Sequence, residues 1–502
     1  MIEHLPVLQI VVPLVAAPLC VLARQRILVV GIAVAACWAS VVMAGLLLER
    51  VLTSGVITYQ LGGWPAPWGI EYRVDTLSAF VLLFVSAVGA LVVSYAPCSV
   101  AAEIPKDRQY LFFTQYLLCL TGLLGIVITG DLFNLFVFLE ISSLSSYALI
   151  SLGRSRRALT ASFRYLVMGT IGATFMLVGI GLMYMMTGTL NMEDMADRLY
   201  VEVLLNGNSV KAIDTRTVTV AFAFLTVGIS LKMALFPMHL WLPNAYTYAP
   251  SVVTAFLAAT ATKVSVYILL RFVFTVFGAT FTFGTLPLDL GLTILSLLGI
   301  VVASTAAIFQ TDIKRMLAFS SVAQVGYMVL GISFASVNGL TGGIVHMFNH
   351  AAIKGGMFLA VGCLVFKLGS VQLEDLRGVG RKMPFTMFSW VLGGLGLIGV
   401  PCTAGFISKW YLVTAALERG WWPVAVLVLG SSLLALIYVW RVVEVAYFQK
   451  PADQATVTGE APLSMLLPTL LVIGASILFG LWTELPISVA RQAAELLLQV
   501  AP

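Results

Sequence analysis

Five ionisable side chains lie deep inside apolar runs of this chain. They are Glu140, Lys232, Lys263, Lys354 and Lys409. A charge at the centre of a bilayer-spanning helix costs about 2.5–3.5 kcal/mol, so these side chains must face one another, a water-filled cavity or a partner. Because lysine and glutamate can be neutralised by losing or gaining a proton, the pattern favours sites that pass protons along.

The composition leaves little room for a soluble domain. The 502 residues are 60% hydrophobic and 10% charged, with a mean hydropathy of +1.00, whereas soluble domains carry about 25% charged residues. The net charge of +5 comes from scattered basic residues, which does not indicate nucleic-acid binding. The six cysteines show no C-x-x-C spacing, so we expect neither a metal site nor a disulfide framework.

Apolar stretches of about 20 residues, the length that crosses a bilayer, predict an all-α polytopic membrane protein with about fourteen spanning helices. The predicted spans are 6–23, 27–48, 76–97, 109–129, 131–151, 164–187, 217–236, 252–273, 288–309, 315–335, 339–367, 385–416, 422–446 and 463–483.

The segments between the spans carry weaker signals. Residues 55–75 alternate apolar and polar positions around Gly-Gly and Pro, which predicts an extramembrane hairpin. Residues 188–216 form the longest polar loop, and residues 485–500 are typical of an amphipathic helix at the membrane surface. One set of alternate loops is richer in Lys and Arg, which predicts that this set is cytoplasmic and that both termini lie outside the inner (plasma) membrane.

Two predicted helices carry a lysine beside a helix breaker. Lys232 precedes Pro237 by five residues, and Lys409 follows Pro401 by eight with Gly405 between them. Broken helices at matching positions of two inverted halves indicate a transport site. We therefore predict inverted five-helix repeats, helices 4–8 and 9–13, with helices 7 and 12 broken. The predicted divisions are 1–108, 109–273, 288–446 and 447–502.

Three long segments resemble a known family. FPMHLWLPNAYTYAPSVVTAFLAATATKVSVYILLR (236–271), DIKRMLAFSSVAQVGYMVLG (312–331) and HMFNHAAIKGGMFL (346–359) are similar to the antiporter-like subunits of Mrp-type Na+/H+ antiporters, respiratory complex I and membrane-bound hydrogenases. Within that family, residues 130–150, 374–384 and 404–412 most resemble the D-type component of the Mrp antiporter.

The resemblance implies a role for each buried ionisable group. Glu140 corresponds to the family's helix-5 glutamate, Lys232 to the helix-7 lysine that pairs with it, and Lys263 to the bridging helix-8 lysine. Lys409 corresponds to the family's helix-12 lysine, the last ionisable group of the series. His346, His350 and Lys354 correspond to the polar face of the family's helix 11. The last three are spaced i, i+4, i+8, which also places them on one helical face.

Each site has a plainer interpretation. Glu140 and Lys232 could form a structural ion pair, Lys263 could snorkel toward the interface, and His346 could make an ordinary helix contact. His239 is either a point where protons enter or a capping residue. Asp131 is expected to cap the N-terminus of helix 5.

The expected function is that of a proton-translocating subunit in a Mrp-type antiporter that exchanges H+ for Na+. Such a chain is an ion transporter and not an enzyme, needs no cofactor, and acts within the lipid membrane beside other antiporter subunits. The alternative is a proton-pumping subunit of a complex I or hydrogenase type of redox complex. A haem enzyme is disfavoured because the chain has four histidines, and a solute transporter because it lacks an Arg or carboxylate cluster for substrate.

Overall fold

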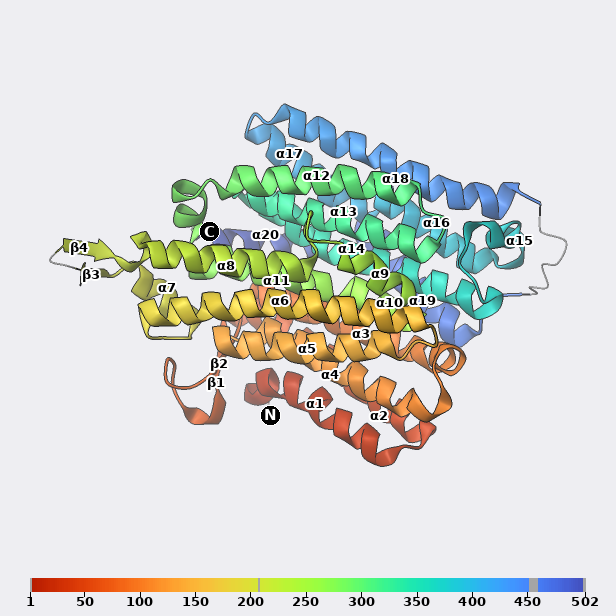
Figure 1. Cartoon of the computed structure of the whole chain (residues 1–502), viewed down its shortest axis with the longest axis horizontal. Helices are drawn as coiled ribbons and strands as arrows, with labels where there is room; N and C mark the ends of the chain where they lie inside the picture. Colours follow the sequence, from red (N-terminus) through yellow and green to blue (C-terminus); the bar gives the residue numbers. More distant parts are fainter. Residues whose placement is uncertain (1, 206–207, 451–458, 500–502) are drawn as a thin grey trace.

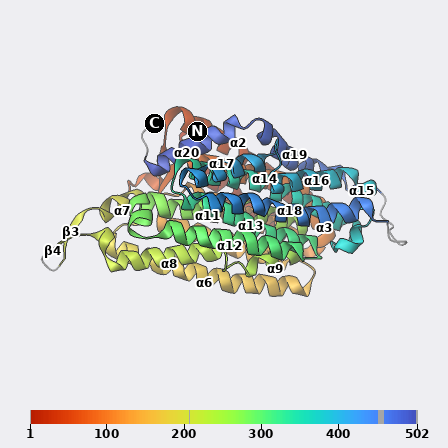
Figure 2. The same ribbon diagram turned by 90° about the horizontal axis from the view of Figure 1, so that it is seen from above.

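The helices of this chain run side by side along the longest axis of the molecule (Figures 1 and 2). The computed structural model describes residues 2–205, 208–450 and 459–499. Both pairs of short strands lie at one end of the bundle (Figure 1), here named the hairpin end. The all-α polytopic fold predicted from the sequence is therefore confirmed.

Thirteen helices in the described residues are long and apolar enough to cross a membrane. They are α1 (Leu5–Ala23), α2 (Arg26–Ser54), α3 (Thr76–Glu103), α4 (Gln109–Ile128), α5 (Leu132–Ser151), α6 (Arg156–Thr187), α8 (Arg216–Met233), α10 (Ser251–Ala259) continued by α11 (Ala261–Leu270), α12 (Leu288–Ile308), α13 (Ile313–Ser333), α14 (Val337–Leu368), α18 (Trp422–Phe448) and α19 (Leu463–Leu481). Each covers one predicted span, and the remaining one, 385–416, is divided between α16 (Pro384–Ile398) and α17 (Ala404–Glu418).

The hairpin predicted at 55–75 is present. Strand β1 (Ile57–Gln60) pairs antiparallel with β2 (Glu71–Val74). The predicted loop 188–216 instead holds α7 (Met192–Leu199) and a second antiparallel pair, β3 (Glu202–Leu205) with β4 (Asn208–Lys211). Residues 206–207 of this loop lie outside the described residues.

Both predicted helix breaks are confirmed. Helix α8 ends at Met233, and the chain resumes a helix only at α9 (Trp241–Tyr248), beyond Pro237. In the second case α16 is terminated by Gly399, whose φ of 86° only glycine adopts easily. Gly405 is also required, because a Cβ there would overlap the carbonyl oxygen of Gly396. The two halves of this broken helix therefore touch backbone to backbone.

A third break lies within the predicted span 252–273, where no proline or glycine indicates it in the sequence. Thr260 separates α10 from α11 with φ −120° and ψ −58°. Its hydroxyl donates to the carbonyl oxygen of Phe256 at 2.7 Å. Such back-bonding by threonine competes with the helix ladder and bends helices, which gives the break its physical cause.

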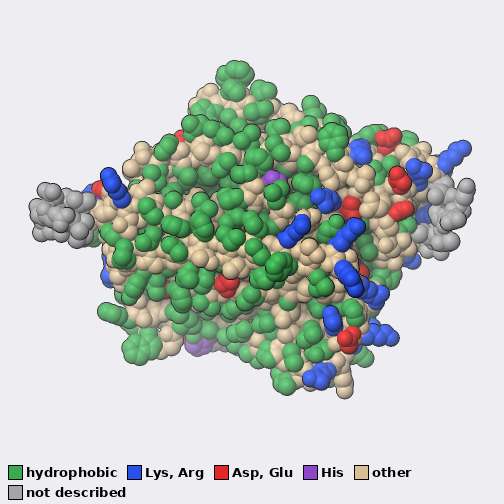
Figure 3. All heavy atoms as spheres, in the orientation of Figure 1, with side chains coloured by type: hydrophobic (Ala, Val, Ile, Leu, Met, Phe, Trp, Pro, Cys, Tyr) green, Lys and Arg blue, Asp and Glu red, His purple; other side chains and the backbone are tan. Residues whose placement is uncertain are grey.

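Helix α14 lies at the centre of the bundle. It contacts α3, α10, α13, α16, α17, α19 and α20 (Glu484–Leu498), and most of its residues are buried. Figure 3 shows hydrophobic side chains over the middle of the visible face, with Lys and Arg gathered mainly toward the end opposite the hairpins. The polar residues in the middle of α14, namely His346, Asn349, His350 and Lys354, are therefore buried within the protein.

The predicted amphipathic segment 485–500 forms α20. Its apolar side, including Val489, Ala490 and Ala493, is buried, and the helix packs against α14 and α3. Residues 451–458 and 500–502 of the predicted C-terminal division 447–502 lie outside the described residues, as does Met1 of the N-terminal division.

Candidate functional site

Glu140 and Lys232 form the ion pair that the sequence predicts. Glu140 lies in the middle of α5, and Lys232 lies in the last turn of α8, two residues before the break begins at Ala234. The Lys232 Nζ donates to Glu140 Oε1 at 3.3 Å and to the hydroxyl of Ser143 at 2.8 Å. The end of a broken helix thus brings an ammonium against two oxygens of α5.

The two members of this pair differ in exposure. The side chain of Lys232 is 3% exposed, whereas that of Glu140 is 28% exposed. Phe133, Val137 and Leu144 are also exposed and follow the same side of α5 at helical spacing. The carboxylate therefore lies at the boundary between the buried side of α5 and the side exposed on the outer surface of the bundle.

Lys263 lies immediately after the third break and is fully buried. Its Nζ donates to the carbonyl oxygen of Ala258, which the break leaves free, and approaches the Thr262 hydroxyl at 3.4 Å. Because Lys263 is 0% exposed and its Nζ bonds inside the protein beside the break, this side chain does not snorkel toward the interface. The partners of this ammonium are neutral oxygens.

A small cavity with a few polar side chains in its lining lies between Lys232 and the helix that carries Lys263. Its volume is about 20 Å³, enough for one water molecule. Lys232 and Ser143 line it from one side, and Thr262 and Ser265 of α11 line it from the other. The Thr262 hydroxyl is also 3.4 Å from the Lys263 ammonium, so a water in this cavity and the Thr262 hydroxyl would together connect the two lysines.

His346 on α14 has hydrogen-bond partners on both sides of its ring. Its Nδ1 lies 2.8 Å from the Ser408 hydroxyl, and its Nε2 lies 2.9 Å from Gln324 Oε1. Ser408 also donates to the carbonyl oxygen of Gly405 at 3.1 Å. A doubly protonated imidazole satisfies all three contacts at once, because it donates from both nitrogens while Ser408 donates its single proton to Gly405. The site can therefore hold a proton on His346.

His350 is stacked on His346 but differs in its partners. The two rings lie 5.9 Å apart at 9°. His350 is 1% exposed, and neither of its nitrogens has a hydrogen-bond partner among the described residues. A buried polar atom without a partner costs about 1–3 kcal/mol, so His350 is poorly explained by packing.

His350→Phe therefore separates packing from function. Phenylalanine keeps a ring of similar size and removes the unpartnered nitrogens, so we expect thermal stability in detergent to stay equal or rise. Proton transport by the assembled complex should fall about tenfold or more, a typical size for a lost proton-transfer group. Unchanged transport in a stable His350→Phe variant would assign this histidine to packing alone.

Lys354 continues the same face of α14 and is fully buried. Its Nζ donates to the carbonyl oxygen of Leu317 at 2.9 Å and to the Ser320 hydroxyl, both on α13. The next residue, Gly355, faces the third break, since a Cβ there would lie 3.3 Å from Ala259 Cβ. Helix α14 is thus adjacent, at the level of Lys354, to the end of α10 just before the break that precedes Lys263.

Lys409 occupies the second broken helix in an unexpected way. It lies on α17, yet its Nζ reaches back to the end of α16, donating to the carbonyls of Leu397 at 3.1 Å and Ile398 at 2.9 Å. The Ser432 hydroxyl accepts a third hydrogen bond at 2.9 Å. A cation at a helix C-terminus interacts favourably with the helix dipole, so the break itself supplies the binding site for this ammonium.

Tyr327 and Ser408 connect Lys409 to His346. The Lys409 Nζ lies 5.0 Å from the centre of the Tyr327 ring, and that ring lies 5.5 Å from His346. Ser408, the neighbour of Lys409 in sequence, contacts His346 directly. Lys409 and His346 are therefore separated only by the side chains of Tyr327 and Ser408.

His239 lies in the segment between α8 and α9 and is buried. Its ring stacks on Phe236 at 5.4 Å, and its Nδ1 has no hydrogen-bond partner among the described residues. Helix α9 starts without a side-chain cap, so His239 does not cap the N-terminus of α9, and its role in proton entry stays a prediction. Asp131, in contrast, caps α5 as predicted, since it accepts from the backbone N–H of Asn134 at 2.7 Å.

Most side-chain partners of the buried lysines and of His346 could not be identified from the sequence. Serines and glutamine inside apolar helices carry no distinctive pattern, and the residues missed here are Ser143, Ser320, Gln324, Ser408 and Ser432. Another omission is Arg271, which lies near the end of the predicted span 252–273 and which the structure buries in an ion pair with Asp75. Within the described ranges, no three His, Cys, Asp or Glu side chains are grouped as a metal site.

A protein-family model described as "NADH:quinone oxidoreductase/Mrp antiporter, TM" matches residues 129–435, more than half of the chain. The chain belongs to this family. The match includes every position from Glu140 to Lys409 discussed above. Membership agrees with the multi-pass helical fold and with the resemblance found in the sequence.

Curated relatives come from two kinds of complex. The chain is 41% identical over 509 residues to the N-type component of a NADH-quinone oxidoreductase of Desulforudis audaxviator (strain MP104C), covering 98% of this chain and 99% of the relative. It is 29% identical over 493 residues to the D-type component of a Na(+)/H(+) antiporter of Bacillus subtilis (strain 168), covering 98% and 97%.

Solved structures of similar fold also come from both kinds. A chain in the structure of the Mrp complex from Dietzia sp. DQ12-45-1b superposes with a TM-score of 0.89 at 24% identity, covering 99% of this chain and 97% of that one. A chain of the membrane-bound sulfane sulfur reductase, an archaeal respiratory membrane complex, superposes with a TM-score of 0.88 at 30% identity, covering 99% and 98%.

Proposed function

We propose that this chain translocates protons along the buried line Glu140, Lys232, Lys263, His350, His346 and Lys409, with Lys354 beside the histidines. The observation that carries the proposal is the set of acceptors around the lysines. The four lysines of this line are buried. Among the described residues only Lys232 of these four has a carboxylate partner, and the other three donate to neutral oxygens. Burying unpaired charges is costly, so few protons can occupy this line at once.

The ion pair controls the first transfer. While Glu140 lies at 3.3 Å from Lys232, its negative charge favours the protonated lysine. When the pair separates, Lys232 loses that support and releases a proton toward the water-sized cavity that Thr262 and Ser265 also line. Lys263 is the acceptor on the far side. The break after Met233 gives Lys232 a flexible helix end on which to move.

The second half of the line passes the proton from α11 to α14 and on to α17. Along α14, the stacked rings of His350 and His346 follow Lys354. Ser408 then connects His346 to α17, the helix that carries Lys409. His239, unpartnered at Nδ1 in the first broken helix, is the group through which protons enter from the end opposite the hairpins.

We also propose the inverted repeats, with the divisions predicted from the sequence. Backbone bridges join Asp131 to Asn191 and Asp312 to Gln372, and both pairs span 60 residues (191 − 131 and 372 − 312). Helices α6 and α14 are both 32 residues long, and each starts 25 residues after its aspartate (156 − 131 and 337 − 312). In Figure 1, α8 and α16 run toward the middle of the bundle from opposite ends.

The chain works as one subunit of a multisubunit membrane complex, as its structural relatives do. We propose that another subunit covers the exposed side of α5. A partly exposed carboxylate at mid-membrane depth is costly against lipid, and Glu140 lies there among Phe133, Val137 and Leu144. The gathered Lys and Arg opposite the hairpins support a cytoplasmic location for that end and external termini, in the plasma membrane.

Two energy sources are compatible with this relay. Exchange of H+ for Na+ is supported by the relative named as an antiporter component, and redox-driven pumping by the 41% identical relative named as an oxidoreductase component. Sodium prefers oxygen ligands, and the deep carboxylate Glu140 is already paired with Lys232. In the antiporter case we therefore assign sodium binding to a partner subunit.

Expression of the chain with its flanking genes in an antiporter-deficient host tests the energy source. Proton movement in everted vesicles that starts on addition of Na+, together with restored sodium tolerance, supports antiport. Proton movement that starts only with NADH supports redox coupling and overturns antiport. The chain expressed without its flanking genes is the control, and it should be inactive under both additions.

A further inference from the structure

A second polar face leads away from the proposed relay along α11. Lys263, Tyr267 and Arg271 follow one another at i, i+4 and i+8, which places them on one side of the helix. Tyr267 is 2% exposed and Arg271 is 7% exposed. The face begins at the third helix break and runs toward the hairpin end, where α11 continues as a π-helical segment, Arg271–Val276. Such segments are frequent at functional sites.

Arg271 forms a closed cluster at the end of this face. Its guanidinium binds both oxygens of Asp75, at 2.6 and 2.7 Å, and donates to the Ser78 hydroxyl at 2.7 Å. Its Nε donates to the Tyr267 hydroxyl at 2.8 Å, and that hydroxyl donates to the carbonyl oxygen of Val127 at 2.7 Å. The tyrosine hydroxyl is thus occupied on both sides.

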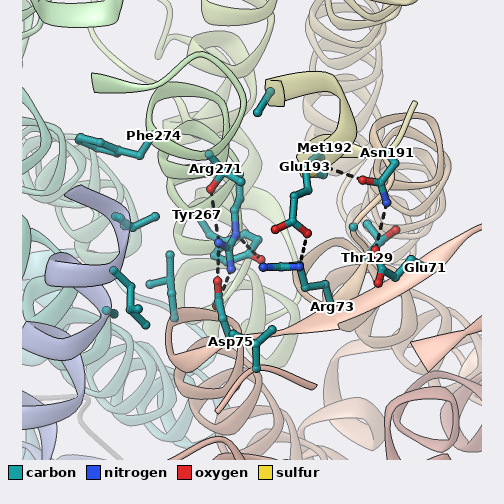
Figure 4. A pocket seen from close by; sticks show the side chains of 18 of the residues that line it. Glu71, Arg73, Asp75, Thr129, Asn191, Met192, Glu193, Tyr267, Arg271 and Phe274 are labelled. Atoms are coloured by element: carbon teal, nitrogen blue, oxygen red, sulfur yellow. Dashed lines mark hydrogen bonds and ion pairs between the residues drawn. The ribbon is translucent and has the colours of Figure 1, made fainter. Parts of the chain in front are cut away.

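The cluster forms one wall of a pocket at the hairpin end. The pocket has a volume of about 270 Å³ and is lined by β2, the start of α3, α7, the π-helical segment and α20. Tyr267, Arg271 and Asp75 line it together with the acidic side chains of Glu71 and Glu193 (Figure 4).

We propose that this pocket is a vestibule through which protons pass between Lys263 and the hairpin end, with the Tyr267 hydroxyl as the link and the Asp75–Arg271 ion pair as the gate. The inference rests on the proposed relay, because Lys263 is the inner end of the path. It gives the relay a second opening, in addition to the end at Lys409.

In the described geometry the Lys263 Nζ donates to the Ala258 carbonyl and the Tyr267 hydroxyl donates to the Val127 carbonyl, so the transfer needs a water molecule between Lys263 and Tyr267 in addition to the residues named. With the gate open, the Lys263 ammonium passes a proton through this water to the Tyr267 oxygen while the Tyr267 hydroxyl proton moves to an Asp75 carboxylate oxygen, which then releases it into the pocket. Lysine ends neutral, tyrosine is unchanged and aspartate returns to its charged form. Arg271 keeps its charge throughout, since guanidinium is effectively never deprotonated.

The described geometry is the closed state of this gate. Arg271 occupies the Tyr267 oxygen and presents a fixed positive charge, and such a charge opposes the passage of protons. Burial raises the pKa of the Asp75 carboxyl, but the charge of Arg271 and the hydrogen bonds from Arg271 and Ser78 outweigh burial and hold the pKa at about 2. Separation of Arg271 from Asp75 removes both obstacles together.

The competing explanation is that the Asp75–Arg271 cluster only stabilises the fold, because Asp75 also caps α3 by accepting from the Ser78 backbone N–H. Tyr267→Phe distinguishes the two. It removes the proton link and leaves the Asp75–Arg271 pair intact. Tyr116→Phe is the matched control, since the Tyr116 hydroxyl is also buried and donates to a carbonyl, that of Gly89, at 2.7 Å.

Both variants are assayed in the assembled complex, with membrane content measured by immunoblot. We expect Tyr267→Phe to lower proton transport about tenfold or more and Tyr116→Phe to stay close to wild type. Equal transport by the two variants overturns the vestibule. If Glu140→Gln is inactive in the same assay while Tyr267→Phe is normal, the relay stands and only the vestibule fails.

Cysteine labelling tests the opening independently of transport. In a Cys402→Ala background, Thr275→Cys lines the pocket and should react with a membrane-impermeant maleimide from the same side as Thr58→Cys on the exposed hairpin. Thr293→Cys, buried on α12, is the unreactive control. Failure of Thr275→Cys to react in either vesicle orientation would show that the pocket is not open to water and would contradict the proposal.

Discussion

Glu140→Gln is expected to leave the chain in the membrane and to reduce proton transport by the assembled complex to near background. At 3.3 Å and an effective dielectric constant of about 20, the gross attraction between Glu140 and Lys232 is roughly 5 kcal/mol. Even if desolvation offsets most of it, a remaining difference of about 1.4 kcal/mol changes the protonation equilibrium of Lys232 tenfold. Glutamine keeps the shape and removes the charge.

The measurement is cation- or donor-driven proton movement in everted vesicles, normalised to the amount of chain in the membrane. Glu444→Gln provides the control, because it makes the same chemical change at an exposed carboxylate on α18. Wild-type transport by a well-expressed Glu140→Gln complex would refute the role of the pair.

A double variant separates the switch from a structural ion pair. Removing one partner of a buried pair leaves the other uncompensated, whereas removing both is often close to neutral for stability. Glu140→Gln combined with Lys232→Met should therefore recover stability and remain inactive. Recovery of transport together with stability would show that the pair serves only the fold.

The membrane spans and two of the three helix breaks could be predicted because each depends on a strong local signal in the sequence. Spans follow from apolar length, and the breaks near Pro237 and Pro401 follow from the donor that proline lacks. The break at Thr260 could not be predicted, since it depends on which acceptor a threonine hydroxyl chooses, here the Phe256 carbonyl. A threonine in an apolar helix gives no sign of that choice.

The lysines could be identified from the sequence, but their partners could not. A buried charge is conspicuous in an apolar run, whereas the neutral oxygens that receive it are backbone carbonyls and serines, most of them on another helix. Lys409 illustrates the limit. The sequence places it after the break, and only the structure shows that its Nζ returns to Leu397 and Ile398 before the break.

The residues at helix ends were the least predictable. Arg271 lies near the end of the predicted span 252–273 and Lys314 lies just before the span 315–335, positions where charged side chains usually reach water, yet both are buried. Arg271 is paired with Asp75 on a helix almost 200 residues earlier, and Lys314 donates to the carbonyl oxygen of Ala249 at 3.1 Å. Such contacts depend on how the helices are arranged, which hydropathy does not specify.

Arginine at the lysine positions should be nearly as damaging as alanine. If Lys232 and Lys409 exchange protons, a guanidinium cannot replace them, because it stays charged at any pH that the protein experiences. The charge, the reach to carbonyl oxygens and the favourable position at the end of α16 would all be retained in Lys409→Arg. What is lost is the ability to become neutral.

We expect Lys232→Arg and Lys409→Arg each to lower proton transport about tenfold or more, matching the corresponding alanine variants, as for other proton-transfer groups. Lys314→Arg is the matched control, because Lys314 is also a buried lysine that donates to a backbone carbonyl but lies outside the proposed line. It reports the cost of fitting the larger side chain. Transport rescued by arginine at either position would mean that a fixed charge is sufficient there, and the relay would then have to bypass that residue.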